Sequence, residues 1–248
     1  MKGRTPARLI YALMLIVSGL LATQGVSKAA DSFVSGVEAY RAGNFVEAAA
    51  AFRTSVNERP SSGALLNLGL AEWHSTRPGP AIIAWEQSLW LNPFEARAGK
   101  NLRFARDSAQ LESPDLRWYE VASTWLSPDT WAWLTGASLW LAVGVLVVPG
   151  VLRRRKRVWH QAVAALGLGV FLVCIPAHIG TTTRTQIGFV LEPETPLRLT
   201  PTSEAENITV LAAGEPVRSL ESRGNFIFVR GSRATGWLRT SDVGFITR

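Results

Sequence analysis

Two uncharged apolar segments constrain this chain more than any other feature, because each is long enough to cross a lipid bilayer. One covers residues 131–152 and the other residues 158–179. A helix of this length, at about 1.5 Å per residue, spans a hydrocarbon core of about 30 Å. A buried helix of a soluble protein can be as apolar, but two in succession at full bilayer length favour a transmembrane hairpin.

The loop between the two segments, residues 153–157, is entirely basic. Its residues are Arg153, Arg154, Arg155, Lys156 and Arg157. Short cytoplasmic loops are enriched in Lys and Arg, so this run predicts the cytoplasmic turn of the hairpin and sets the topology. The net charge of +7 comes from this run and from residues 1–29, since the rest of the chain is close to neutral. That distribution argues against nucleic-acid binding, which requires a basic patch on a folded surface.

Residues 1–29 are typical of a secretory signal peptide. A basic start is followed by the apolar stretch Leu9–Ala22 and by Ser27-Lys28-Ala29, which fits cleavage after Ala29. An uncleaved membrane anchor is the alternative. With the loop inside, residues 30–130 and 180–248 are expected on the outer, periplasmic face of a bacterial cytoplasmic membrane. Residues 112–130 are rich in Trp, which favours an interfacial segment before the first span, although packing against the first domain is also possible.

Residues 30–111 contain an internal repeat at an offset of 33 residues. The matching pairs are Gly36 with Gly69, Ala48 with Ala81, Phe52 with Trp85, Ser55 with Ser88, and Pro60 with Pro93. This period is typical of a tetratricopeptide (TPR) repeat, in which glycines let two helices approach and large side chains fill the space between helices. A third helix over residues 95–111 is expected to cap the stack. The predicted partner-binding groove is lined by Phe33, Val37, Tyr40, Leu66, Leu70, Trp73 and Lys100, with packing in the core as the alternative role for the aromatic residues.

Residues 187–248 follow a Thr-rich linker at 180–186 and change to short β-rich runs. The runs PLRL, ITVL, PVRSLE, FIFVR and GWLR alternate with turn signals at 201–202, 213–215, 223–225 and 231–232. Closely spaced short strands predict a small all-β barrel. The stretch PLRLTP and the ending TGWLRTSDV resemble a bacterial SH3 domain. The resemblance implies a module that binds peptides or cell-wall material, with Phe226 and Trp237 in its core or its groove.

The expected fold is therefore a multidomain membrane protein with an all-α TPR repeat, an α-helical transmembrane hairpin and an all-β SH3-like barrel. This domain order resembles the BatE family of aerotolerance-operon membrane proteins, and the segment KNLRFAR at 100–106 is similar to the helix that ends the repeats there. The resemblance implies a scaffold that cooperates with von Willebrand A domain Bat proteins and a MoxR-type ATPase.

The sequence contains no pattern that predicts catalysis, a metal site or a cofactor. His74, His160 and His178 are expected in different parts of the molecule, and Cys174 lies in an apolar run where a buried thiol is expected. The predicted function is a membrane-anchored scaffold or adaptor that binds protein partners in the periplasm, and not an enzyme. The alternative is a protein that binds or senses peptidoglycan through residues 187–248.

Overall fold

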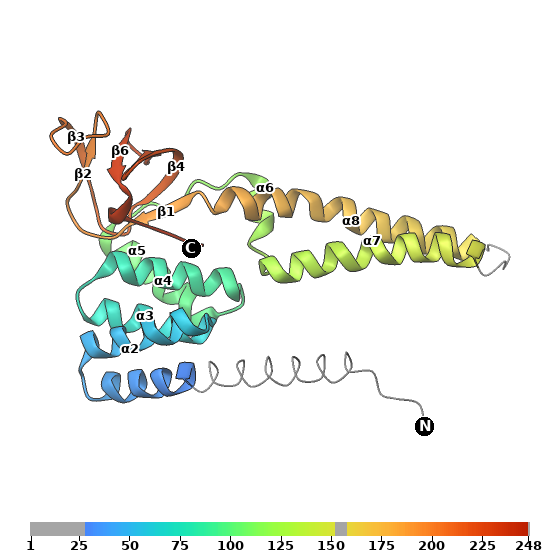
Figure 1. Cartoon of the computed structure of the whole chain (residues 1–248), viewed down its shortest axis with the longest axis horizontal. Coiled ribbons are helices and arrows are strands. Elements are labelled where there is room, and N and C mark those ends of the chain that lie inside the picture. The colour runs from blue at the N-terminus through green and yellow to red at the C-terminus, as the bar shows by residue number, and fades with distance from the viewer. Residues whose placement is uncertain (1–27, 152–157, 248) are drawn as a thin grey trace, which may run out of the picture.

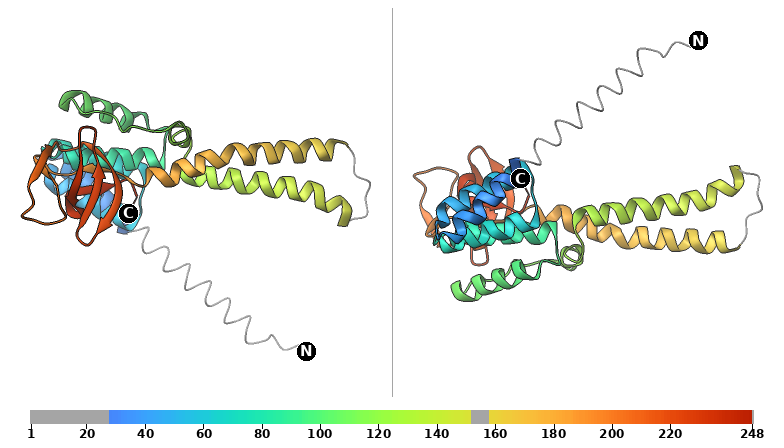
Figure 2. Two further views of the ribbon diagram at one scale, coloured as in Figure 1. Left: turned by 90° about the horizontal axis from the view of Figure 1, so that it is seen from above. Right: turned by 90° about the horizontal axis from the view of Figure 1, so that it is seen from below.

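The computed structural model describes residues 28–151 and 158–247 of the chain. Its described part has three regions, which Figures 1 and 2 show from different sides: a stack of helices, a β-sheet beside it, and a long helical hairpin that projects from both. The predicted signal peptide up to residue 27 and the basic run at 153–157 lie outside the described residues.

The helical stack begins with helical residues 28–41 and continues through α2 (Phe45–Glu58), α3 (Ser62–His74), α4 (Pro78–Leu91) and α5 (Ala96–Ala109). The predicted helix over 95–111 corresponds to α5. Lys28 and Ala29, at the predicted cleavage site, are helical and contact α2: Ser55 Oγ donates to the Ala29 carbonyl at 2.8 Å, and Lys28 Nζ lies 2.8 Å from a Glu58 oxygen. Cleavage after Ala29 would remove both contacts.

The repeat at an offset of 33 residues has a matching pair of close contacts. A Cβ added to Gly36 would lie 2.8 Å from the ring of Phe52, and one added to Gly69 would lie 2.6 Å from Cδ1 of Trp85. Phe52 and Trp85 are both 1% exposed. Each large ring therefore occupies the space left by the missing side chain of its own helix pair, and Trp85 Nε1 also donates to the Leu66 carbonyl at 3.3 Å. The first and second helix of each pair pack together through these contacts.

The two apolar segments form long antiparallel helices, α7 (Pro128–Val151) and α8 (Val158–Arg184), preceded by the short helix α6 (Trp118–Ser123). Both long helices have the length and composition needed to cross a membrane, and only 17% and 22% of their most apolar windows are buried. A core helix of a soluble protein would be mostly buried. The interface between α7 and α8 is built from small buried side chains, as is usual for helices packed in a bilayer. Its members include Ser138, Ala142, Ala164 and Gly167.

The predicted linker at 180–186 is helical as far as Arg184. Thr181 and Thr182 both donate their hydroxyl groups to the His178 carbonyl, at 2.8 and 3.1 Å, and Thr183 donates to the Ile179 carbonyl at 3.1 Å. These hydroxyl groups bond back to carbonyl groups three or four residues earlier, so each finds a partner within the helix. The helix extends five residues beyond the apolar segment, which ends at Ile179, and stops shortly before the first strand begins at Ile187.

The C-terminal region is a single antiparallel sheet of seven strands. The strands are β1 (Ile187–Val190), β2 (Thr195–Arg198), β3 (Asn207–Leu211), β4 (Pro216–Arg223), β5 (Phe226–Arg230), β6 (Thr235–Arg239) and β7 (Val243–Phe245), with the 3-10 turn η1 (Thr240–Asp242) before β7. Their order is β3-β2-β6-β5-β4-β1-β7, so the sheet is open, with β3 and β7 at its edges, rather than the closed barrel that was expected. All seven strands still contribute to one buried cluster, because the sheet curls around a single core.

The helical stack and the sheet share a hydrophobic core. Ile82, Ile83 and Trp85 of α4 belong to the same buried cluster as Ile187 and Phe189 of β1. Gly79, at the start of α4, lies so close to the chain after β1 that a Cβ there would be 2.6 Å from the Val190 carbonyl oxygen. The two domains that the sequence predicts as separate modules therefore contact each other directly.

Candidate functional site

The predicted groove residues lie on the first helix of each pair, except Lys100 of α5, and most of them are partly buried. Leu66 is 2% exposed and belongs to the core. Phe33, Val37, Tyr40, Leu70 and Trp73 are partly buried against the two helical clusters, while Lys100 is exposed. Among the predicted groove residues, Leu66 is therefore a buried core residue and is not accessible to a partner.

Aromatic side chains occur on the first helix of each pair and on α5. Tyr40 lies in residues 28–41, Trp73 in α3 and Phe104 in α5, and we call these three residues the aromatic row. The ring centroids of Trp73 and Phe104 are 5.9 Å apart, and Phe104 is 62% exposed. Sequence reasoning missed Phe104, although it follows Lys100 by one helical turn and shares its face. The row offers an apolar surface beside a positive charge.

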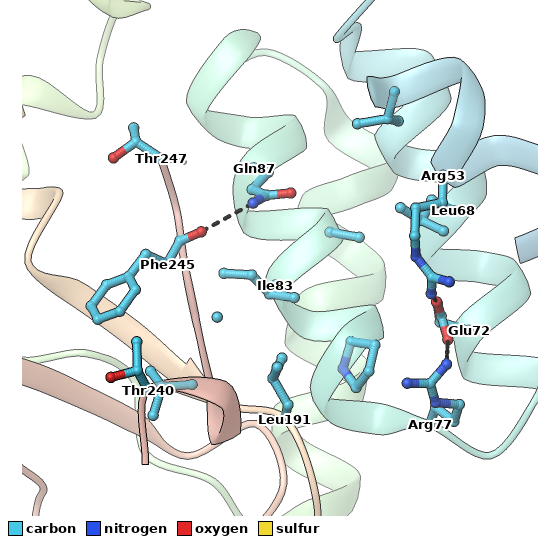
Figure 3. A pocket seen from close by; sticks show the side chains of 15 residues that line it. Arg53, Leu68, Glu72, Arg77, Ile83, Gln87, Leu191, Thr240, Phe245 and Thr247 are labelled. Atoms are coloured by element: carbon cyan, nitrogen blue, oxygen red, sulfur yellow. Dashed lines mark hydrogen bonds and ion pairs between the residues drawn. The ribbon is translucent and has the colours of Figure 1, made fainter. Parts of the chain in front are cut away.

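A cavity of about 460 Å³ lies between the helical stack and the sheet. On one side Gln87 Nε2 of α4 donates to the Phe245 carbonyl of β7 at 3.0 Å, so a helix covers this edge of the sheet. On the other side the buried carboxylate of Glu72 lies between Arg53 and Arg77, and Arg77 also reaches Glu192 at 3.7 Å. Figure 3 shows the two walls, with Ile83 and Leu191 between them. The cavity is the concave region that the two domains form together.

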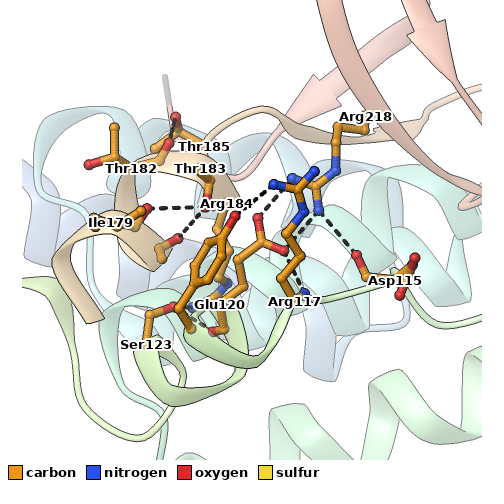
Figure 4. A network of polar contacts seen from close by, with 12 residues as sticks. Asp115, Arg117, Glu120, Ser123, Ile179, Thr182, Thr183, Arg184, Thr185 and Arg218 are labelled. Atoms are coloured by element: carbon orange, nitrogen blue, oxygen red, sulfur yellow. Dashed lines mark hydrogen bonds and ion pairs between the residues drawn. The ribbon is translucent and has the colours of Figure 1, made fainter. Parts of the chain in front are cut away.

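A polar junction connects the sheet to the base of the hairpin. Arg218 of β4 donates to both carboxylate oxygens of Glu120, at 2.8 and 3.0 Å, and to the Asp115 carbonyl at 3.1 Å. Glu120 is 0% exposed and also accepts from the backbone N–H of Arg117 at 2.9 Å. Figure 4 shows these groups beside Ser123 and Arg184 at the end of α8. The junction fixes the sheet to α6, which packs against α8.

The outer face of the sheet carries the SH3-like candidates Phe226 and Trp237. Trp237 is 8% exposed and lies 5.1 Å, between ring centroids, from Phe228, with the guanidinium of Arg223 5.5 Å from its ring. Phe226 is half-buried and lies two residues before Phe228, so both phenyl rings face the same side of the sheet. The Trp237 ring is covered by Phe228 and Arg223 and forms part of this face of the sheet.

The remaining reactive side chains of the described residues are separated. His74 stacks on Phe45 at 4.7 Å, His160 on Trp159 at 3.8 Å, and the His178 ring nitrogen lies 2.8 Å from the Thr135 hydroxyl. Cys174 is 1% exposed and packs with Trp131 and Ala177, which confirms the expected buried thiol. In residues 28–151 and 158–247, no group of three or more His, Cys, Asp or Glu residues is placed to hold a metal ion.

Comparisons of the chain with protein-family models, with curated proteins and with solved structures found no match. The fold itself defines a class of protein: a joined helical and β-sheet body carried on a two-helix hairpin that is long and apolar enough to cross a membrane.

Proposed function

We propose that this protein is a membrane-anchored scaffold, or adaptor, that holds protein partners on the periplasmic side of the cytoplasmic membrane. In this proposal α7 and α8 are the anchor, the helical stack is a TPR-type repeat and the sheet is an SH3-like domain. The observation that carries the proposal is the aromatic row, in which Phe104 of α5 is exposed on the same face as Lys100 and packs edge-on against the partly buried Trp73. Amphipathic partner segments bind such surfaces through a few buried aromatic anchors.

The test is co-purification of partners with the tagged full-length protein in mild detergent. Replacement of both Trp73 and Phe104 by Ala should reduce partner recovery about tenfold or more, because truncating an aromatic hot spot costs about 2 kcal/mol or more. Phe94→Ala is the matched control, since Phe94 is also an exposed aromatic residue, at 75%, but lies outside the row. Recovery of nothing above background, or equal loss in the control, would contradict the proposal.

We further propose a Bat/MoxR-type envelope stress or aerotolerance system as the setting, with von Willebrand A domain proteins and a MoxR-type ATPase as partners. The basis is the resemblance in domain order, together with the direct contact between the two outer domains. Genes for such an ATPase and for von Willebrand A proteins beside the gene for this chain are the expected finding. A neighbourhood without them would remove the support for this setting while leaving the scaffold proposal intact.

Peptidoglycan binding or sensing is the second candidate function, and the outer face of the sheet favours it. Half-buried Phe226 and Phe228 lie beside Trp237 and Arg223, a combination that provides stacking surfaces and hydrogen-bond donors. In a sedimentation assay with purified peptidoglycan, the full-length protein in detergent should be retained and a Phe226→Ala, Phe228→Ala variant released. Equal retention of both proteins, or of neither, would exclude this face as the binding site.

A further inference from the structure

A second cavity, of about 310 Å³, lies where the end of α8 meets the helical stack. Its walls come from α4, α5, α8, the connection at 113–116 and both ends of the sheet region. The apolar lining residues include Leu89, Leu102, Leu116, Ile187 and Ile246. The charged residues that line it are Glu86, Arg106 and Arg184.

Arg184 is buried in this cavity with few partners. It is 8% exposed, and within the described residues its hydrogen bond from Nη1 to the Ser123 hydroxyl, at 3.4 Å, engages one of the five N–H donors of the guanidinium. Its Cζ lies 4.9 Å from the centre of the Trp90 ring. Among the described residues, no carboxylate lies within ion-pair distance of Arg184.

The neighbouring carboxylates are already engaged by other arginines. Glu86 pairs with Arg106, and Glu120 pairs with Arg218. The buried and partly buried charges between α5 and β4 therefore comprise three guanidinium groups and two carboxylates, and Arg184 is one of them. Nε of Arg106 is also buried without a hydrogen-bond partner. Glu86 and Glu120 attract Arg184 at longer range, but the cluster keeps one excess positive charge, and excess charge in a poorly hydrated site favours an anion in the cavity.

The position of Arg184 along α8 indicates which anion is available. It follows the apolar segment, which ends at Ile179, by five residues, or about 7.5 Å of helix. The headgroup layer on each side of a bilayer is about 5–7 Å thick, so the backbone of Arg184 falls at its outer edge, from which a long arginine side chain can reach the phospholipid phosphates. Trp118 and Trp125, on and just after the adjoining α6, are 71% and 66% exposed, as expected for aromatic side chains in this layer.

We propose that this cavity binds a phospholipid of net negative charge, with its phosphate paired to Arg184 and its glycerol and upper acyl carbons against the apolar walls. The inference rests on the membrane hairpin of the proposed function but not on any protein partner. A bound lipid would lock α8 to α4 and α5, so the outer body would be held at a fixed orientation on the hairpin.

Native mass spectrometry of the detergent-solubilised full-length protein tests this proposal. The wild-type protein should retain phosphatidylglycerol about tenfold more strongly than phosphatidylcholine, since charge-assisted pairing with one guanidinium contributes about 1.5–3 kcal/mol. Arg184→Gln should abolish the preference, and Arg103→Gln, which removes an exposed charge of α5, should retain it. Equal retention of the two lipids by the wild type, or an unchanged preference in Arg184→Gln, would overturn the proposal.

Three further measurements make the outcome of this test clear. Leu116→Trp fills the cavity while leaving Arg184 in place, so loss of the lipid preference in this variant supports the site even if Arg184→Gln folds poorly. Displacement of phosphatidylglycerol by millimolar inorganic phosphate would show that the ligand is free phosphate and would overturn the lipid assignment. Flotation with vesicles separates the two levels of failure. If the protein floats but shows no lipid preference, only the lipid site is contradicted. If the protein does not float, the membrane anchor of the proposed function is contradicted.

Discussion

Glu120 is the residue on which the junction between the sheet and the hairpin depends most. Burial by itself raises the pKa of this carboxyl group, but hydrogen bonds from Arg218, the Arg117 backbone and Thr183 outweigh burial and lower its pKa from the ordinary value of 4.5. A pKa that is lower in the folded state means that the stabilisation is present above pH 4.5. It is lost as the pH falls through the lower, folded-state pKa.

We predict that Glu120→Gln lowers the free energy of unfolding by about 3–5 kcal/mol at neutral pH, because it leaves the charge of Arg218 without its buried partner. The variant should also lose stability less steeply than the wild type when the pH is lowered below 4.5. Thermal unfolding followed by Trp fluorescence at pH 7 and below pH 4.5 measures both effects. Glu221→Gln is the control, because its ion pair with Arg223 is 52% exposed on the Glu221 side and should contribute about 0–1 kcal/mol. Equal effects of the two substitutions would contradict the role given to Glu120.

Sequence reasoning did not find this junction for a physical reason. Glu120 and Arg218 are 98 residues apart in the chain and lie in different elements, and neither belongs to a motif. Arg184 likewise lies in the segment that the sequence predicts as a Thr-rich linker at 180–186. Phe52 and Trp85 were found because the repeat places each of them at a fixed distance from a glycine. Local periodicity is readable from sequence, whereas buried charge pairing depends on the assembled tertiary structure.

At the scale of single elements, the close packing of α3 against α4 provides a direct test of the repeat. We predict that Gly69→Ala destabilises the protein by about 1–3 kcal/mol, because the new Cβ would overlap the Trp85 ring in a well-packed core. Gly63→Ala is the matched control: it lies in the same helix with nothing within 4 Å, and should be neutral or stabilising. Chemical denaturation of the detergent-solubilised protein measures both changes. A neutral Gly69→Ala variant would contradict the packing described for the repeat.

The two strands that the sequence did not predict, β1 and β7, are those that contact the helical stack. All four residues of β1 are buried, since one face contributes to the core of the sheet and the other packs against α4. A strand buried on both faces lacks the apolar–polar alternation by which strands are recognised. β7 has three residues and follows a 3-10 turn, so it is too short for a pattern. The five predicted runs, by contrast, correspond to β2 through β6.

At the scale of the whole molecule, the shared core indicates that the helical stack and the sheet unfold together. We predict that the helical stack and the sheet of the wild type show one thermal transition in scanning calorimetry. Gly79→Val should show two transitions, because any side chain at Gly79 would push the sheet away from α4. Gly99→Val is the control, since Gly99 of α5 has open space around its Cα. A single transition in Gly79→Val at the wild-type temperature would show that the two domains are not coupled through this contact.

We propose that both folded domains work together on one side of a membrane, anchored by α7 and α8. Single-cysteine labelling tests it most directly, since Cys174 is the chain's only cysteine and can be replaced by Ala. New cysteines are placed at the exposed residues Ser35 and Ser203, one in each domain, and at Arg155 in the basic run. In intact spheroplasts, an impermeant maleimide should label the cysteines at 35 and 203, and should label the one at 155 only after lysis. Labelling of only one domain, or of position 155 before lysis, would contradict this membrane topology.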